Sequence, residues 1–487
     1  MQSEELITLD ELAAKPPMKS INLPLDSSPR PRAWRFELTQ YPWIKGLLRS
    51  RWPQLILTAI ALAGFVLAIL TGLFGTPVGS RNFGILFVWI AWWAILMLIT
   101  VPFFGRGWCS ICPIPGPGEW LQRGALLSPA GKPGLGLGKR WPRRLRNIWL
   151  QNGSFLLVAL FSSVVLTQPR LTGIVLAAFL FIALGASLVF ERRSFCRYLC
   201  PVGGFIGLYA QVAPVELRVK DPAVCAAHTV KSCYIGSEQG YGCPWQVFPG
   251  GLSKNTYCGT CMECLRTCTE DNILVQVRPV GADLGVPGGR KLDEAYKAFI
   301  MLGAALVYMA VLLGPWGFLK NAAYSVGSLA WAAYAVAFLA FVLVGLPGLF
   351  LLAVLVGRRL AGLRTPLKRL FIAFAYALVP LGLAAWIAFS LSFVLTNLSY
   401  LLPALSDPFG WGWDLFGTAG AAWTPYLSGA IPALQVLALL AGLGGSALVV
   451  RRIAGEGTTR QAAARLSVPV SLFCLGITLS LMVLLVG

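Results

Sequence analysis

Four cysteines stand close together between Cys258 and Cys268, with the spacing C-x2-C-x2-C-x3-C. Short loops with this spacing bind [4Fe–4S] clusters, because three thiolates can reach three irons of one cubane and the fourth points toward a second cluster. Zinc sites use separated pairs of cysteines or histidines instead. The run of Cys258, Cys261, Cys264 and Cys268 therefore predicts iron–sulfur chemistry.

Three further cysteines precede this run, and the last of them, Cys243, is followed by Pro244. A cysteine–proline pair closes a cluster-binding run of this type. We therefore expect Cys243 to act as the fourth ligand beside the first three thiolates of the run. The ligands expected for this first cluster are Cys243, Cys258, Cys261 and Cys264.

Three cysteines remain for a second cluster, which needs four ligands. They are Cys225 and Cys233 from the upstream segment and Cys268 from the run. The only histidine of the chain, His228, stands at the two-residue gap after Cys225 where a second cysteine would be expected. We interpret His228 as the missing ligand; the alternative is a solvated loop histidine beside a three-cysteine cluster. An imidazole in place of a thiolate makes a cluster less negative and raises its reduction potential.

The remaining loop cysteines belong to an internal repeat. In each copy an arginine and an aromatic residue precede two cysteines, and a proline and a glycine follow them. The copies are Arg106 to Gly116, with Cys109 and Cys112, and Arg193 to Gly203, with Cys196 and Cys200. Because each copy directly follows an apolar segment, we expect both cysteine pairs at the same depth, at the membrane boundary.

These two pairs predict a third site of four ligands. Eleven loop cysteines and His228 make twelve ligands, which is enough for three sites of four. Cys109, Cys112, Cys196 and Cys200 could instead form redox dithiols, hold another metal such as zinc, or serve as structural thiols. The twelfth cysteine, Cys474, stands alone in an apolar segment, and we interpret it as a buried, inert thiol.

The elements that must position these cysteines are membrane helices. Of the 487 residues, 56% are hydrophobic and only 12% are charged, whereas soluble domains carry about 25% charged residues. Apolar stretches near 20 residues are long enough to cross a bilayer, and Pro347 predicts a kink in one long stretch. About nine spans are expected, at 54–75, 83–104, 150–167, 171–190, 297–318, 327–356, 370–396, 428–450 and 467–486.

The basic residues predict the orientation of these spans. The chain has 40 Lys and Arg against 20 Asp and Glu, and the cations cluster in loops beside apolar segments. That distribution is typical of the cytoplasmic loops of a bacterial inner-membrane protein and does not indicate nucleic-acid binding. With nine spans the cysteine loops lie in the cytoplasm, where stable disulfides are rare, and the C-terminus lies on the opposite side.

Composition and pattern divide the chain into four parts. These are a cytoplasmic N-terminal tail (1–52), a first membrane bundle with the cysteine repeat (53–215), a soluble insert (216–292) and a second membrane bundle (293–487). Val215–Val219 and Ile273–Val277, on the two flanks of the insert, alternate as strands do. We expect an α-helical membrane protein with a small α+β domain, like a two-cluster ferredoxin, inserted between two bundles.

In these motifs the chain resembles the membrane polyferredoxin family of NapH- and NosR-type [4Fe–4S] proteins, and the related protein CcoG is also similar. The resemblance rests on Cys109 to Pro113, Cys196 to Pro201 and the cysteines between 225 and 268. It implies an electron-transfer subunit of the quinol dehydrogenase type, with other redox subunits as partners. The chain departs from the family in its shorter first cysteine pair, in its stretched first ferredoxin run and in the second bundle.

We therefore expect a membrane-bound protein that relays electrons between a quinone pool and a partner redox protein through two [4Fe–4S] clusters, with a third at the membrane surface. Haem is not expected, because the chain has one histidine and no C-x-x-C-H motif. Two other functions stay open at this point: an assembly or regulatory redox factor for a partner metalloenzyme, and a redox-sensing transporter. The sequence assigns no catalytic residue.

Overall fold

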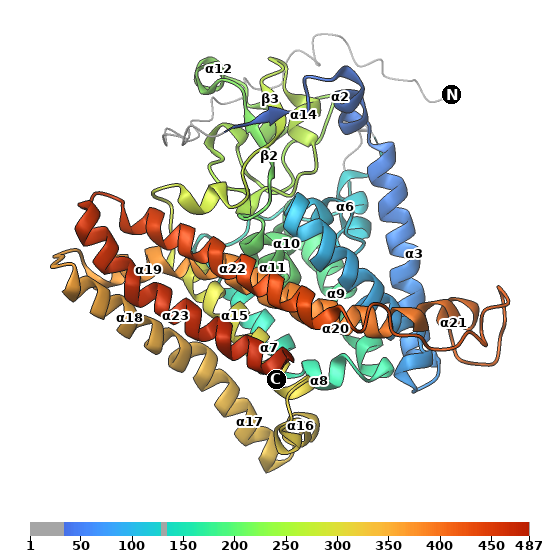
Figure 1. Ribbon diagram of the computed structural model, residues 1–487. Coiled ribbons are helices and arrows are strands. Elements are labelled where there is room, and N and C mark those ends of the chain that lie inside the picture. The colour runs from blue at the N-terminus through green and yellow to red at the C-terminus, as the bar shows by residue number, and fades with distance from the viewer. Residues whose placement is uncertain (1–33, 128–133, 487) are drawn as a thin grey trace, which may run out of the picture.

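A computed structural model describes residues 34–127 and 134–486 of the chain. Long helices form one body beneath a smaller, irregular layer (Figure 1). That layer is the insert, which holds the strands β2 and β3 together with the short helices α12 (Pro222–Ala227) and α14 (Glu263–Thr267). The helix α2 (Pro42–Arg49), from the N-terminal segment, packs against α14.

Eight helices within the described residues are long and apolar enough to cross a membrane, judged by length and composition. They are α3 (Trp52–Phe74), the stretch α4–η2–η3 (Phe83–Phe104), α9 (Pro169–Val189), α15 (Leu292–Leu312), the stretch α17–η8–α18 (Leu329–Leu360), the stretch from α19 to α21 (Leu367–Ser406), α22 (Ile431–Ala454) and α23 (Arg460–Val486). The chain is a multi-pass helical membrane protein with eight full-length spans in this part of the sequence, where nine were expected.

The segment 150–167, predicted as the third span, is not among these eight long helices. It forms two short helices, α7 (Trp149–Leu160) and α8 (Ser162–Val165). At the break, Ser162 Oγ donates a hydrogen bond to the carbonyl oxygen of Ala159 (2.8 Å). Such bonds from a serine side chain to the preceding turn bend or end helices. The segment predicted as a short span is therefore a broken pair of helices and is not one of the eight long ones.

The path of the chain shows that α7 and α8 still connect opposite ends of the molecule. Arg193, just after α9, donates to the carbonyl of Cys109, just after η3 (Ile95–Phe104), so these two spans end together. The start of α9 lies at the far end of α3, where a Cβ on Gly72 would come within 3.0 Å of Gly173 Cα. The chain between η3 and α9 must therefore return to that far end, and α7 and α8 make this return.

The irregularity expected at Pro347 takes the form of a π-helical segment. Between α17 (Leu329–Ala340) and α18 (Leu346–Leu360) lies η8 (Phe341–Gly345), whose turns are wider than those of an α-helix. Proline cannot donate a backbone hydrogen bond, and its ring crowds the preceding turn. A π-helical turn just before it accommodates both effects within one long helix.

The two strands expected on the flanks of the insert pair with each other. β2 (Val215–Val219) and β3 (Ile273–Val277) are antiparallel, with Leu217 opposite Val275. A third strand, β1 (Phe36–Glu37), pairs with the other edge of β3, so the strand order is β1-β3-β2. The sequence predicts an N-terminal tail over residues 1–52. The described part of that segment instead contributes a strand to the sheet of the insert.

Charged side chains fasten the N-terminal segment to α14. Arg51 donates to the carboxylate of Glu263 (3.0 Å), and Arg266 donates to the carbonyl of Ser50 (3.0 Å). Burial would raise the pKa of Glu263, but the neighbouring arginines, Arg51 and Arg123 among them, outweigh burial and lower it. Because α14 begins inside the cysteine run, this ionic network also fixes the position of the run.

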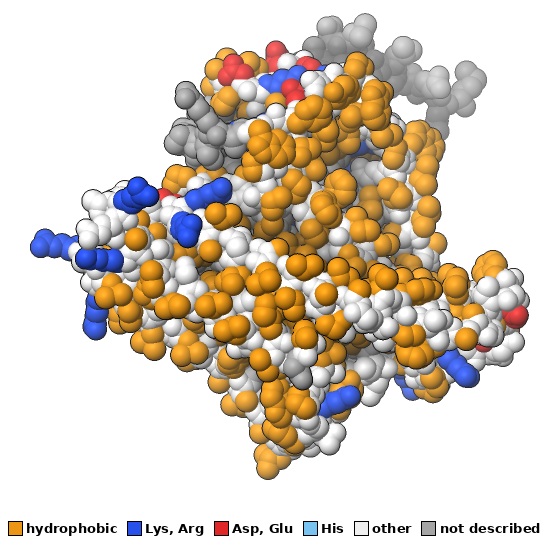
Figure 2. Space-filling view, viewed as in Figure 1, with side chains coloured by type: hydrophobic (Ala, Val, Ile, Leu, Met, Phe, Trp, Pro, Cys, Tyr) orange, Lys and Arg blue, Asp and Glu red, His pale blue; other side chains and the backbone are white. Residues whose placement is uncertain are grey.

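Short helices complete the structure around the long ones. They are α5 (Gly107–Ile111), α6 (Gly116–Arg123), α10 (Ser194–Tyr198), α11 (Pro201–Tyr209), α13 (Ser232–Ile235) and α16 (Gly317–Tyr324). Figure 2 shows hydrophobic side chains spread over the outer faces of α17, α18, α22 and α23. In the second bundle α20 (Leu378–Asn397) is the central helix and packs on α15 and α22.

Candidate iron–sulfur sites

The two copies of the cysteine repeat meet in the structure. The first cysteine of each pair, Cys109 or Cys196, is buried in a short helix, α5 or α10. The second follows that helix, and Cys200 stands directly before the first residue of α11. The backbone N–H of Gly203 donates to Cys200 Sγ (3.2 Å). A helix N-terminus presents free N–H groups in this way to an anion such as a thiolate.

All four cysteines of the repeat line one cavity of about 100 Å³, which we call the four-thiol cavity. The rest of its wall is apolar and aromatic, and includes the tryptophans Trp89, Trp92, Trp93 and Trp108. A wall of this kind excludes water from the sulfurs. Solvent exposure and hydrogen bonds to sulfur are two of the factors that set the potential of an iron–sulfur cluster.

The arginine that opens each copy of the repeat reaches across to the other copy. Arg193 donates to the carbonyl of Cys109 and, through Nε, to the carboxylate of Glu119 (2.9 Å). Arg106 donates to the carbonyl of Gly203 (2.6 Å). Both arginines are buried, so two positive charges stand beside the thiols. The matching position of the two arginines in the repeat was the sequence signal for this contact.

Burial controls the acidity of the thiols in this cavity. Burial raises the pKa of Cys200 to about 11. Burial, followed by the neighbouring thiols of the cavity, also raises the pKa of Cys112. Arg106 and Arg193 act in the opposite direction on these two residues, because a nearby cation favours the thiolate. Metal centres bind thiolates, so binding in this cavity must release protons.

The cysteine run lines a second cavity together with Cys243. The four cysteines expected for the first cluster all border a space of about 20 Å³, and they form what we call the run group. The loop between Cys258 and Cys264 is tightly wound, with positive φ at Thr260 (45°) and Met262 (62°). A Cβ at Gly259 would overlap the buried indole of Trp245, so only glycine fits there.

Cys225, Cys233 and Cys268 lie together at the outer end of the insert, and we call them the outer group. Asn272 joins two of them: its backbone N–H donates to Cys268 Sγ and its side-chain amide donates to Cys225 Sγ, both at 3.3 Å. Burial, followed by the thiols of Cys268 and Cys225, raises the pKa of Cys233 to about 12. The three sulfurs are thus within electrostatic reach of one another.

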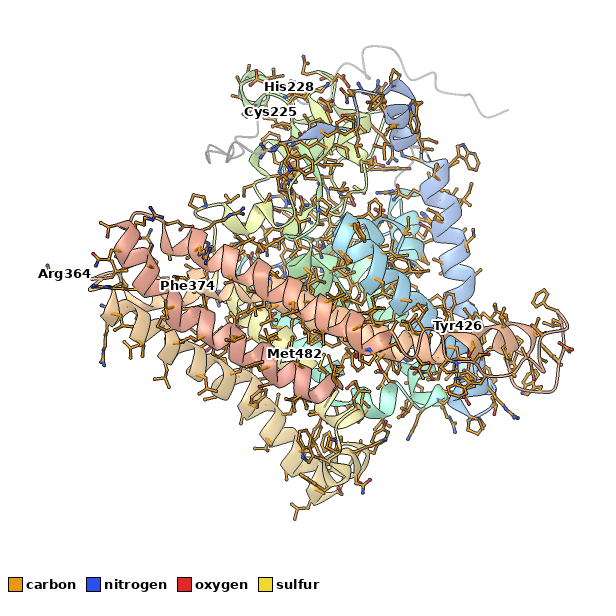
Figure 3. The ribbon with its side chains drawn as sticks, viewed as in Figure 1. Cys225, His228, Arg364, Phe374, Tyr426 and Met482 are labelled. Atoms are coloured by element: carbon orange, nitrogen blue, oxygen red, sulfur yellow. The ribbon has the colours of Figure 1, made fainter. Side chains whose placement is uncertain are left out.

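His228 lies near the outer group, beside Cys225 at the top of the insert (Figure 3). Its backbone N–H donates to the carbonyl of Val224 (3.1 Å), and its own carbonyl accepts from the ammonium group of Lys231. Within the described residues no hydrogen bond joins its half-exposed ring to a sulfur. The structure therefore brings the histidine to the group without fixing its imidazole on it.

The buried Arg106 and the partly buried Arg192 hold the run group directly on the repeat. Arg106 donates to the carbonyl of Thr256 (2.6 Å), just before the run, and its guanidinium stacks on Trp245 at 4.3 Å from the ring centre. Arg192 donates to the carbonyl of Cys243 (2.8 Å). These contacts join the segments beside the four-thiol cavity to the insert directly through side chains.

Packing gives the order of the three groups. Cys243 and Cys261 of the run group pack against the buried cluster that contains Cys109, Cys196 and Cys200. Cys258 and Cys264 of the run group belong to a second cluster, together with Cys225, Cys233 and Cys268. The run group thus lies between the other two.

One polar network beside the repeat could not be predicted from the sequence. Lys297 of α15 is 1% exposed and donates to Gln151 (3.3 Å), which in turn donates to the carbonyl of Cys196 (3.0 Å). One turn earlier, the buried carboxylate of Glu294 accepts from the hydroxyl of Tyr257 (2.5 Å). Only the packing of α15 against α7 and the insert brings these residues together.

Across residues 34–127 and 134–486, no group of three or more His, Cys, Asp or Glu side chains converges closely enough to hold one metal ion. A [4Fe–4S] cluster is held by four thiolates, one on each iron. The four thiols that line the four-thiol cavity match that number of ligands.

The fold and these cysteine groups define a multi-pass membrane protein with an iron–sulfur binding domain. A family profile described as a 4Fe–4S binding domain matches residues 85–145 and 172–220. The two matched segments contain both cysteine pairs of the repeat and most of the spans before them. The match therefore supports [4Fe–4S] binding by the chain, and the cysteine run lies outside it.

Two curated proteins are similar to part of the chain. The methylamine utilization ferredoxin-type protein MauN of Paracoccus denitrificans (strain Pd 1222) is 29% identical over 135 residues, which are 25% of this chain and 44% of MauN. The "Putative electron transport protein YccM" of Escherichia coli (strain K12) is 24% identical over 128 residues, 26% of this chain and 32% of YccM. The chain thus spans less than half the length of either relative. No solved structure matches the chain.

These similarities and the 4Fe–4S domain support iron–sulfur electron transfer as the general function of the chain.

Proposed function

We propose that this chain is a membrane-bound electron-transfer subunit whose three cysteine groups hold [4Fe–4S] clusters in a row. The observation that carries this proposal is the order of the groups: the run group packs against the four-thiol cavity on one side and against the outer group on the other. Bound there, the clusters would pass single electrons along the row. The proposed ligands are Cys109, Cys112, Cys196 and Cys200; Cys243, Cys258, Cys261 and Cys264; and Cys225, His228, Cys233 and Cys268.

The surrounding residues suit the role of each group in this row. Tryptophans keep water from the four-thiol cavity, and the buried guanidinium groups of Arg106 and Arg193 offset negative charge beside it. A cation near a cluster favours the more negative, reduced state and so raises the potential. The outer group stands at the tip of the insert with Cys225 half-exposed, where a partner redox protein can approach.

We further propose that the four-thiol cavity exchanges electrons with a quinone in the bacterial inner membrane. The cavity is apolar and aromatic and lies where η3 and α9 end, next to the hydrocarbon region that a quinone occupies. The basic loops favour a cytoplasmic insert. Eight long helices and the α7–α8 pair make nine crossings, which put the C-terminus on the other side of the membrane.

Reduction by a quinol tests this proposal. The full-length protein with its clusters, kept free of oxygen, is mixed with a short-chain quinol and examined by electron paramagnetic resonance. We expect signals of reduced clusters, and dithionite should then add little. If dithionite reduces the clusters and quinol reduces none, the quinone role is wrong while the clusters stand. If the cysteines of the repeat react with thiol reagents in the loaded protein, a redox-factor function replaces the relay.

Replacing His228 with cysteine is expected to lower the potential of one cluster by on the order of 100 mV, because a thiolate is more negative than an imidazole. A redox titration followed by electron paramagnetic resonance measures this shift. His228→Ala is the matched variant, since it removes the ring without adding a thiolate. Titration curves that match the wild type in both variants would remove His228 from the ligand set.

A further inference from the structure

A large cavity on the second bundle is built by loops that none of the cysteine groups uses. It measures about 580 Å³, and we call it the basic cavity. It lies where residues 287–290, at the end of the insert, meet the turn between α18 and α19 (Leu367–Ala375) and the turn between α22 and α23. Its floor is apolar and includes Leu370, Ile453 and Leu466.

The rim of the basic cavity carries a surplus of positive charge. Three cations line it, Arg290, Lys368 and Arg369, against one carboxylate, Glu456, so the net charge is +2. The charge of Arg290 is already paired, because its two Nη atoms donate to the two carboxylate oxygens of Glu456 at 2.6 and 2.8 Å. Lys368 and Arg369 have no ion-pair partner within the part of the chain that the structure describes. These two cations are available to an anion.

An apolar groove of about 470 Å³ adjoins the basic cavity, and Lys368 lines both. Its wall is formed by side chains such as Val344, Leu351 and Phe371. It runs past the π-helical η8 and past Gly348, where a Cβ would meet nothing within 4 Å. The groove therefore offers an open, hydrocarbon-lined path that begins at a cationic rim.

The position of this pair of hollows matches the level of lipid headgroups. Figure 2 shows Lys and Arg side chains gathered at the corner where α18 turns into α19 and α22 into α23, at the edge of the hydrophobic surface. Arg364, which Figure 3 labels at this corner, lies in the turn just before α19, and Lys368 is the second residue of that helix. Basic pockets between membrane helices at this level bind anionic lipid headgroups.

We propose that the basic cavity and the apolar groove together bind one anionic phospholipid, with its phosphate at Lys368 and Arg369 and an acyl chain in the groove. A free phosphate would use the cavity alone, and a neutral lipid would use the groove alone. Lys368 lines both hollows, which favours a molecule with an anionic head and a hydrocarbon tail. This binding site does not depend on the proposed electron-transfer function.

Native mass spectrometry of the full chain in detergent tests this site, with equal amounts of dioleoyl phosphatidylglycerol and dioleoyl phosphatidylcholine added. We expect the wild type to retain the anionic lipid about tenfold or more over the neutral one, since two cations at the lipid surface attract an anionic headgroup. Lys368→Gln with Arg369→Gln should abolish that preference. Gly348→Phe, which fills the groove, should lower the binding of both lipids.

The matched control removes the same charge elsewhere, through Arg143→Gln with Arg144→Gln on the exposed basic loop before α7. This variant should keep the preference for the anionic lipid, and equal loss in both double variants would show a general charge effect and overturn the site. Full displacement of the lipid by millimolar inorganic phosphate would show an anion site without a lipid tail. An unchanged preference in the Lys368 and Arg369 variant, at wild-type melting temperature, would also overturn the proposal.

Discussion

Replacing Arg193 with methionine is expected to lower the stability of the protein by about 3 kcal/mol, because it strips one partner from a buried carboxylate. Glu119 accepts hydrogen bonds from both Arg193 and Arg123. Burial would raise its pKa, but these two arginines outweigh burial and lower it. The substitution also removes the donor to the Cys109 carbonyl, which links the two copies of the repeat. Thermal unfolding in detergent measures the loss.

Two further variants separate the ion pair from other effects of this substitution. Adding Glu119→Leu to Arg193→Met should restore part of the stability, because the buried carboxylate is then gone and Arg123, which loses it as a partner, keeps its contact with the ring of Tyr241. Arg123→Met is the matched single change, and it should cost less because the side chain of Arg123 is 16% exposed against 5% for Arg193. An Arg193→Met protein as stable as the wild type would contradict the ion-paired repeat.

Replacing Cys196 with alanine is expected to remove about four of the roughly twelve irons per chain, the content of one cubane among three. The run group and the outer group draw their ligands from the insert, so their clusters should remain. Iron analysis and the electron paramagnetic resonance spectrum of the reduced protein measure the change. The expected result is the loss of one spectral component with the others unaltered.

Cys474→Ala is the control for this substitution, since Cys474 is buried in α23 away from the cysteine groups and should leave the iron content unchanged. Cys258→Ala should remove a different component, that of the run group. If Cys196→Ala keeps all the iron of the wild type, the four-thiol cavity does not hold a cluster.

The grouping of the cysteines was predictable where the cysteines are close in sequence. Cys258 and Cys261 lie on one loop and Cys264 follows at the start of α14, so their spacing alone brings them to one cavity. Cys243 could be added because the proline after it is part of a recognisable pattern. The internal repeat also predicted that the two cysteine pairs lie at the same depth. Two copies of one local structure must do so when the spans before them run in the same direction.

Contacts between segments that are far apart in the sequence could not be predicted, because no local spacing pattern indicates them. Nothing in the residues near Lys297 indicates that Gln151 will accept from it, because α7 and α15 meet only in the folded bundle. The break between α7 and α8 is invisible to a count of apolar residues, because it is a change in the backbone at one apolar residue, Phe161 (φ −98°, ψ 4°). The pairing of β1 with β3 likewise joins residues about 240 apart in sequence, too distant for local propensity to indicate.

The iron and acid-labile sulfide content of the full-length protein, purified without oxygen, tests the central claim most directly. Three [4Fe–4S] clusters predict about twelve irons and about twelve sulfides per chain. About eight of each would leave the four-thiol cavity without a cluster and would break the row at its membrane end. Zinc in place of iron, or iron without sulfide, would contradict the account altogether.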